Sequence, residues 1–145
     1  MKITVVGVGN AGSTFGAQLS RIGHEVTLLK TSNRLHNEHY ELLKKNKQIR
    51  VVDKYLGDYT ADICCVTDSF EEAIPKADLI IVYIQTNYHE EVVKRMAPYL
   101  KNGQIVFFEP GYLSTCYLLK YCNKNVISIE AESSPVDCRI VEPGV

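Results

Sequence analysis

Short apolar runs alternate with amphipathic stretches along most of the chain. The runs KITVVG, HEVTLLK and ADLIIVYIQ are rich in β-branched and other apolar residues, so they predict strands. Between the first two runs, Phe15, Leu19 and Ile22 recur at helical spacing. The third run has an uninterrupted apolar centre, which is typical of a strand buried on both faces of a parallel sheet.

The same alternation continues through the second half of the chain. Residues 87–100 predict a helix that Gly103 ends, and QIVFFEP predicts a strand. GYLSTCYLLKYC predicts a further helix and NVISIEA a last strand. The closing stretch, ESSPVDCRIVEPGV, shows no period, so its structure is not predicted.

The middle of the chain interrupts this order. Residues 35–45 predict a helix, and we interpret the following runs, IRVVDKYL and TADICCVT, as a β-hairpin insertion. Asp68 and Glu71 have the spacing of a capping box at the start of a short helix. The whole pattern predicts an α/β fold over residues 1–145. We expect one Rossmann-like, doubly wound, mainly parallel sheet with helices on both faces, plus this hairpin.

Composition narrows the class of partner. The 145 residues carry a formal net charge of −1, with no basic excess for nucleic acid, and no apolar run is long enough to cross a bilayer. The five cysteines are odd in number and form no C-x-x-C, which favours buried thiols in a reducing setting. We therefore expect a cytoplasmic protein without nucleic-acid or membrane partners. Homodimer formation stays open.

A glycine-rich turn follows the first predicted strand. Gly7, Gly9 and Gly12 match G-x-G-x-x-G between a predicted strand and a predicted helix. A second predicted strand follows the helix, so the whole unit spans about 30 residues, as this motif requires. Gly7 permits the tight exit from the strand, Gly9 lets the backbone approach a pyrophosphate, and Gly12 lets the helix pack closely. The backbone N–H groups around Asn10, Ala11 and Gly12 then face an anion. This context favours a dinucleotide site over a purely structural turn.

The end of the second strand bears on which dinucleotide binds. A site that prefers NAD usually has an acidic residue there to hold the ribose 2′-hydroxyl, but LLKTSNR contains none. Lys30 and Arg34 can instead bind a 2′-phosphate, with hydroxyl groups from Thr31 and Ser32 adding hydrogen bonds. The pattern predicts NADP as cofactor. NAD and a solvated basic loop are the alternatives.

Polar residues also follow two later strands. Gln85 and Thr86 come after the most apolar strand, and ligands of open α/β sheets lie at such carboxyl ends, so both are candidates for the nicotinamide end. Thr86 can equally cap the next helix. Glu109 ends the next strand, and we expect it at the same crevice. His36 and His39 lack a third ligand, so no metal site is predicted.

Three stretches resemble the amino-terminal domain of the opine (octopine) dehydrogenase family, which is related to ketopantoate reductase and glycerol-3-phosphate dehydrogenase. They are MKITVVGVGNAGSTFGAQLSRIGHEVTLL, FEEAIPKADLIIVYIQTNYHEEVVKRMAPYLKNGQIVFFEPG and IEAESSPVDCRIVEPG. The resemblance as a whole extends over nearly the whole chain. The resemblance implies reductive joining of an amino acid and a 2-oxo acid with NAD(P)H. It assigns Gly7, Gly9 and Gly12 to the pyrophosphate and places Gln85 and Thr86 near the nicotinamide. Relatives often have proline where this chain has Gln85.

The resemblance also implies that cofactor binding and catalysis are divided between two domains. Family members are considerably longer, and a second, helical domain supplies the catalytic histidine and most of the substrate pocket. We expect that C-terminal domain to be absent from these residues, so no catalytic residue is named, and small-molecule substrates would bind only with the missing domain. The chain alone is then expected to bind the dinucleotide without turnover.

Three alternatives stay open. A ketopantoate reductase-like NADP domain shares the fold and the cofactor. A non-catalytic nucleotide-sensing regulatory domain shares the length and the glycine turn, although it usually has the acidic residue that is missing here. A methyltransferase also uses a glycine-rich first turn, and it too would usually have that acidic residue.

Overall fold

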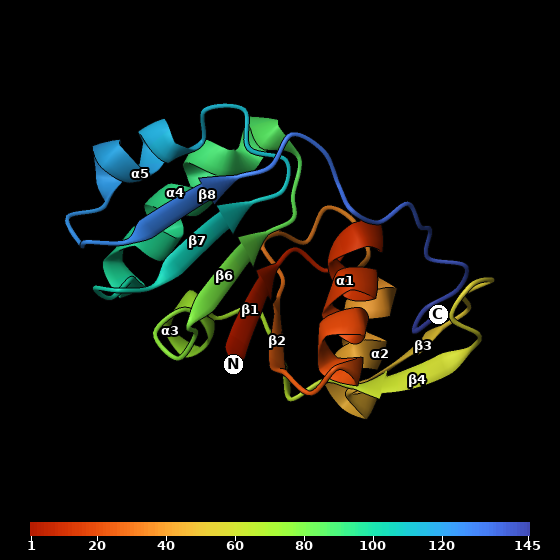
Figure 1. Cartoon of the computed structure of the whole chain (residues 1–145). Helices are drawn as coiled ribbons and strands as arrows, with labels where there is room; N and C mark the ends of the chain where they lie inside the picture. The colour runs from red at the N-terminus through yellow and green to blue at the C-terminus, as the bar shows by residue number, and fades with distance from the viewer.

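Six parallel strands form one sheet at the centre of the computed structural model, which describes residues 1–145 (Figure 1). The strand order in space is β5-β2-β1-β6-β7-β8. The bounds of these strands are β1 Lys2–Val6, β2 Glu25–Leu29, β5 Cys65–Thr67, β6 Leu79–Val82, β7 Ile105–Phe108 and β8 Ile127–Glu130. The chain runs outward from β1 in both directions, so the predicted Rossmann-like, doubly wound sheet is confirmed.

Helices cover both faces of the sheet, as predicted. They are α1 Asn10–Arg21, α2 Asn37–Asn46, α3 Phe70–Ala73, α4 His89–Met96 and α5 Thr115–Tyr121, with 3₁₀ turns η1 Thr86–Tyr88 and η2 Ala97–Tyr99. In Figure 1, α1 and α2 lie on the side of β1 and β2, whereas α4 and α5 lie behind β7 and β8. None of these helices has the length and apolar character that a membrane span requires.

Each central strand contributes to two separate cores, because successive side chains point to opposite faces. Val5 and Leu28 are buried in the core that includes α1 and α2, whereas their neighbours Val6 and Leu29 are buried in the core that includes α3 and α4. This explains the uninterrupted apolar runs in the sequence.

The predicted hairpin is present, but its second run divides. β3 (Gln48–Val51) pairs with β4 (Tyr59–Asp62) in a separate antiparallel sheet, from Gln48 opposite Asp62 to Val51 opposite Tyr59. The rest of TADICCVT leaves the hairpin. The Cys64 N–H donates to the Val26 carbonyl oxygen at 3.0 Å, and residues 65–67 then become β5 of the main sheet.

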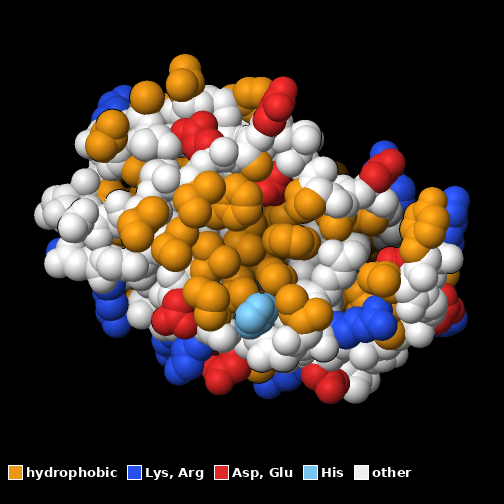
Figure 2. Space-filling model, viewed as in Figure 1, with side chains coloured by type: hydrophobic (Ala, Val, Ile, Leu, Met, Phe, Trp, Pro, Cys, Tyr) orange, Lys and Arg blue, Asp and Glu red, His pale blue; other side chains and the backbone are white.

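One half of a sheet face has no helix of this chain over it. Leu79, Ile105 and Ile127 lie side by side in register across β6, β7 and β8, and Ile81, Phe107 and Ile129 form the next row. Figure 2 shows hydrophobic side chains gathered at the centre of this face. The side chains become more exposed toward the sheet edge, where Ile127 is 55% and Ile129 45% exposed.

The cap of α3 corrects one sequence prediction. The N-cap is Ser69, one residue later than the predicted Asp68, and its Oγ accepts from the Glu72 N–H at 3.2 Å. Ser69 and Glu72 have the same i, i+3 spacing as Asp68 and Glu71, so the spacing alone could not choose between the two registers.

We expect Ser69→Ala to lower the free energy of unfolding by about 1 kcal/mol, because the Glu72 N–H loses its acceptor. Asp68→Ala, the matched control, should change it by less than about 0.5 kcal/mol. Urea unfolding of the two variants measures both values. Equal losses would contradict the observed cap.

Candidate functional site

The turn between β1 and α1 is shaped by two glycines that pack against backbone. Gly7 has φ +126°, and a Cβ there would overlap the carbonyl oxygen of Tyr83. A Cβ on Gly12 would overlap the carbonyl oxygen of Gly7 itself. Both glycines are therefore required by the fold, whether or not a ligand is bound.

Gly9 differs from them. Its φ of −98° suits any residue, and the closest side chain to an added Cβ is the His36 ring, at 3.7 Å. No side chain caps α1, whose first residue is Asn10, and its first turn holds no acidic residue. The N–H groups of that turn and the positive end of the helix dipole are therefore available to an anion. The space over Gly9 is the space that a pyrophosphate needs.

A cavity of about 500 Å³ opens at this turn, at the carboxyl ends of β1 and β6. Its lining includes ten of the eleven residues predicted to bind the cofactor: Gly7, Gly9, Asn10, Ala11, Gly12, Lys30, Thr31, Ser32, Arg34 and Gln85. The eleventh, Thr86, starts the 3₁₀ turn η1 and lies outside this lining. Glu109 lines the cavity, at the crevice where the sequence placed it.

The two basic residues at one end of the cavity have different surroundings. Lys30 is buried, its ammonium donates to the Leu35 carbonyl oxygen at 2.8 Å, and burial lowers its pKa. Arg34 is exposed. Its guanidinium donates to the Tyr88 hydroxyl at 2.9 Å and lies 5.1 Å from the centre of that ring. Lys30 therefore holds the loop after β2, and Arg34 is the cation that a ligand can reach.

Two ionisable groups are buried at the other end. Glu109 is 2% exposed, and burial raises the pKa of its carboxyl. The Tyr83 hydroxyl lies 3.1 Å from Ser134 Oγ, and burial raises the pKa of Tyr83 to about 12. Sequence reasoning missed Tyr83 and Ser134, because one lies inside an apolar strand run and the other in a stretch without period.

The C-terminal tail, residues 131–145, is tied to this site. It runs from β8 across the sheet toward β3 and β4 (Figure 1). The Ile140 N–H donates to Asn10 Oδ1 at 3.0 Å, so the tail is bonded to the first residue of α1. Cys138 and Arg139 line the cavity from the tail. The Asn10 side chain thus holds the tail, which leaves its backbone N–H as the group facing an anion.

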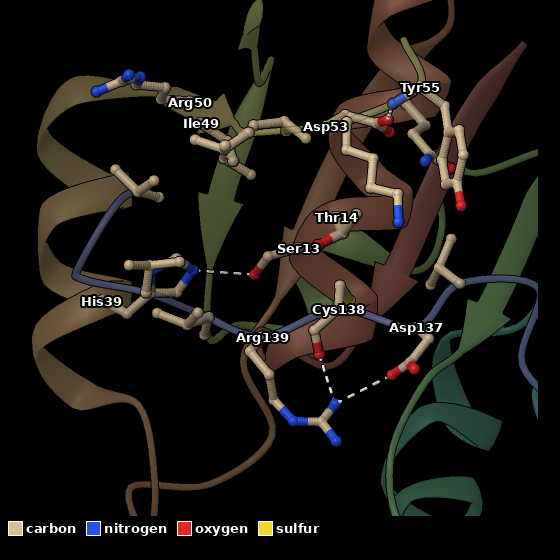
Figure 3. Close-up of a pocket in the computed structure, with 18 of the residues that line it drawn as sticks. Ser13, Thr14, His39, Ile49, Arg50, Asp53, Tyr55, Asp137, Cys138 and Arg139 are labelled. Carbon is tan, nitrogen blue, oxygen red and sulfur yellow. Dashed lines mark hydrogen bonds and ion pairs between the residues drawn. The ribbon is translucent and has the colours of Figure 1, made fainter. Parts of the chain in front are cut away.

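His39 anchors the end of the tail beside a second cavity, of about 630 Å³ (Figure 3). Its Nδ1 accepts from the Gly144 N–H at 3.0 Å, so Nε2 carries the proton and donates to Ser13 Oγ at 3.0 Å. Figure 3 shows the His39 ring and the Ser13 hydroxyl facing each other. Burial, followed by the charges of His36 and Lys30, lowers the pKa of His39 to about 4.

The side chain of His89 connects two elements of the fold. It is fully buried, with Nε2 donating to the Ile84 carbonyl oxygen at 3.1 Å and Nδ1 2.6 Å from Ser114 Oγ. It joins the end of β6 to the start of α5 and does not line the cavity. Nowhere in the chain do three or more His, Cys, Asp or Glu side chains gather closely enough to hold a metal.

Comparison with known proteins shows that the sequence of this chain is similar to those of several dehydrogenases. The family model described as ketopantoate reductase PanE/ApbA matches residues 3–130. An opine dehydrogenase from Haliotis discus hannai is 30% identical over 156 aligned positions, covering 99% of this chain and 38% of the relative. A glycerol-3-phosphate dehydrogenase [NAD(P)+] from Agathobacter rectalis is 25% identical over 105 residues, covering 72% of this chain and 30% of the relative.

Solved structures agree with these relatives. A structure of octopine dehydrogenase with NADH and L-arginine superposes with a TM-score of 0.81 at 26% identity, covering 99% of this chain and 38% of that protein. Yersinopine dehydrogenase shares the fold, with a TM-score of 0.75 at 16% identity. The chain therefore spans less than two fifths of the length of these proteins.

We expect Gly12→Ala to lower the free energy of unfolding by roughly 3 kcal/mol, because its Cβ meets backbone that cannot move aside. Gly9→Ala should leave stability within about 1 kcal/mol of the parent, since the added methyl group finds space. Thermal and urea unfolding would show the difference. Similar losses in both variants would contradict the different roles of the two glycines.

We further expect the free energy of unfolding to decrease as the pH is lowered, because His39 takes up a proton more readily in the unfolded chain than in the folded one. Its folded-state pKa of about 4 lies below the value of about 6.5 in the unfolded chain. The neutral ring therefore stabilises the fold fully above pH 6.5, and up to about 3 kcal/mol is lost as the pH falls toward 4. Urea unfolding from pH 7.5 to 4 should show a shallower fall for His39→Gln. Parallel curves for parent and variant would refute the assignment.

Proposed function

The chain belongs to the ketopantoate reductase PanE/ApbA family, and from this premise we propose that it is the NADP(H)-binding domain of an opine dehydrogenase-like oxidoreductase. The reaction would join an amino acid to a 2-oxo acid and reduce the resulting imine by hydride transfer. The observation that carries the proposal is the uncapped start of α1 beside Gly9, where the packing of the fold leaves space next to backbone N–H groups that suit an anion.

The tail favours the opine branch over a ketopantoate reductase-like domain. The family model ends at residue 130, whereas the similarity to the opine dehydrogenase of Haliotis discus hannai extends over 99% of the chain and so includes the tail. The same tail supplies Ser134, Cys138 and Arg139 to the cavity lining. The part of the chain that separates the two branches therefore contributes to the site.

NADP is proposed in preference to NAD because the residues that follow β2 include basic side chains and no acidic one. No acidic residue follows that strand before Glu38, so a ribose 2′-hydroxyl lacks its usual acceptor. The exposed guanidinium of Arg34 lies at the cavity and is suited to a 2′-phosphate. NAD is the alternative, and the octopine dehydrogenase structure described above contains NADH.

The chain is proposed to bind and orient the cofactor, while substrate binding and proton transfer belong to residues outside 1–145. It covers 38% of the Haliotis relative. The only histidine among the residues that line the cavity is His36, whose ring lies beside Gly9. We therefore name no residue of this chain as catalytic.

Titration of the purified chain with NADPH and with NADH, followed by nicotinamide fluorescence, tests the proposal. We expect NADPH to bind roughly tenfold more tightly or better, because the 2′-phosphate gains charge-assisted hydrogen bonds from Arg34. Arg34→Ala should remove this preference and leave NADH affinity nearly unchanged. Arg50→Ala is the matched control, since that exposed arginine pairs with Asp58 away from the cavity.

Each other outcome has a defined meaning. Equal or tighter binding of NADH would overturn the NADP assignment alone. Failure of the folded chain to bind either dinucleotide, or unchanged binding by Gly9→Ala, would overturn the cofactor site. Steady NADPH oxidation after addition of an amino acid and a 2-oxo acid would show that catalytic residues are present. A nucleotide-dependent change of oligomeric state would favour the sensor alternative.

A further inference from the structure

Glu109 is buried at the cavity without a partner for its side chain. It directly follows β7, and its backbone N–H donates to the Val82 carbonyl oxygen at 3.0 Å, which fixes the residue at the junction of β6 and β7. The residue is 2% exposed, and its Oε1 has no hydrogen-bond partner. An unpaired buried carboxyl destabilises a fold, so one that is retained requires an explanation.

The rest of the chain does not satisfy this carboxyl. Glu109 takes part in none of the ion pairs of the structure. The Tyr83 hydroxyl is near enough for the charge of Glu109 to contribute, after burial, to raising the pKa of Tyr83, but that hydroxyl is paired with Ser134. Within residues 1–145 the Glu109 side chain therefore has no partner, which leaves it available to a ligand of the cavity.

The position of Glu109 limits the class of such a ligand. Glu109 lines the same cavity as Gly9 and Gln85, at the carboxyl end of the strand next to β6. A dinucleotide whose pyrophosphate lies at the start of α1 extends its nicotinamide toward the carboxyl ends of the strands beyond β1. Glu109 stands at that end of the cavity, whereas Arg34 stands at the end proposed for the 2′-phosphate.

The chemistry of the nicotinamide substituent matches an unpaired carboxyl. The carboxamide offers two N–H donors and one carbonyl acceptor. In either protonation state the Glu109 carboxyl keeps an oxygen that can accept from the carboxamide N–H. A 2-oxo acid would instead bring a second carboxylate toward Glu109, and like charges repel in a water-poor site.

We propose that the Glu109 carboxyl binds the carboxamide of the nicotinamide ring and so sets which face of the ring is presented to substrate. The inference rests on the proposed function, since it names the contact at the reactive end of the same dinucleotide. It makes Glu109 a cofactor-orienting residue, because holding the carboxamide prevents the ring from turning over about its bond to ribose.

The test separates the ring from the remainder of the cofactor. The ligands are NADPH, 2′-phospho-ADP-ribose, which lacks nicotinamide, and the 3-acetylpyridine analogue of NADPH, in which a methyl group replaces the carboxamide NH₂. We expect Glu109→Leu to weaken NADPH binding about tenfold and to leave 2′-phospho-ADP-ribose within about twofold of the parent. Glu109→Gln, the matched isosteric control, should retain most of the NADPH affinity.

The acetylpyridine analogue identifies the interacting group. The parent should bind it about tenfold more weakly than NADPH, and Glu109→Leu should bind the two nearly equally, as expected when both partners of one contact are removed. Thermal unfolding without ligand should show no loss of stability in Glu109→Leu, because the variant removes a buried, unpaired carboxyl. A weaker cofactor complex in an equally stable protein excludes a folding defect.

Several results would overturn the inference. They are an equal weakening of 2′-phospho-ADP-ribose and NADPH, unchanged NADPH binding in Glu109→Leu, and discrimination against the acetylpyridine analogue that survives in that variant. If the parent binds an amino acid and Glu109→Leu loses that binding while NADPH still binds, Glu109 would be assigned to an amine instead. If the folded parent binds neither NADPH nor 2′-phospho-ADP-ribose, the proposed function itself fails, and this result is distinct from the others.

Discussion

The close packing of backbone on backbone in the turn after β1 is the constraint on which the rest of the site depends. Gly12 lies directly against the carbonyl of Gly7, and Gly7 lies directly against the carbonyl of Tyr83 at the end of β6. These two contacts set the position of α1 relative to the sheet. They leave the amino-terminal N–H groups of α1 uncapped at the carboxyl ends of the strands, where they face the cavity.

The order of the strands makes this end of the sheet accessible to a ligand. The chain moves from β1 to β2 on one side and from β6 to β7 and β8 on the other, so the connections above β1 and β6 diverge. Open α/β sheets bind ligands at such a point. The tail crosses back over it and is held by Asn10, the first residue of α1, and by His39 of α2.

The two ends of the cavity are chemically distinct, in the manner of a dinucleotide. An exposed guanidinium, Arg34, stands at one end, with Lys30 buried beneath it as a support for the loop. The other end is lined by Glu109 and Tyr83, both buried and both with pKa values raised chiefly by burial. The glycine turn lies between them. A cation at one end and buried side chains at the other suit a phosphate and a nicotinamide, respectively.

The sequence by itself determined the alternation of strands and helices, the parallel sheet and the glycine turn, because periodicity and glycine backbone geometry are local properties. It also placed Glu109 at the cavity, through the rule that carboxyl ends of parallel strands meet. Contacts between distant residues decided the rest: the transfer of Cys65–Thr67 to the main sheet, the bond from Ile140 to Asn10 and the burial of Lys30. Whether a carboxyl such as that of Glu109 is paired depends on everything packed around it, so only the tertiary structure could leave it without a partner.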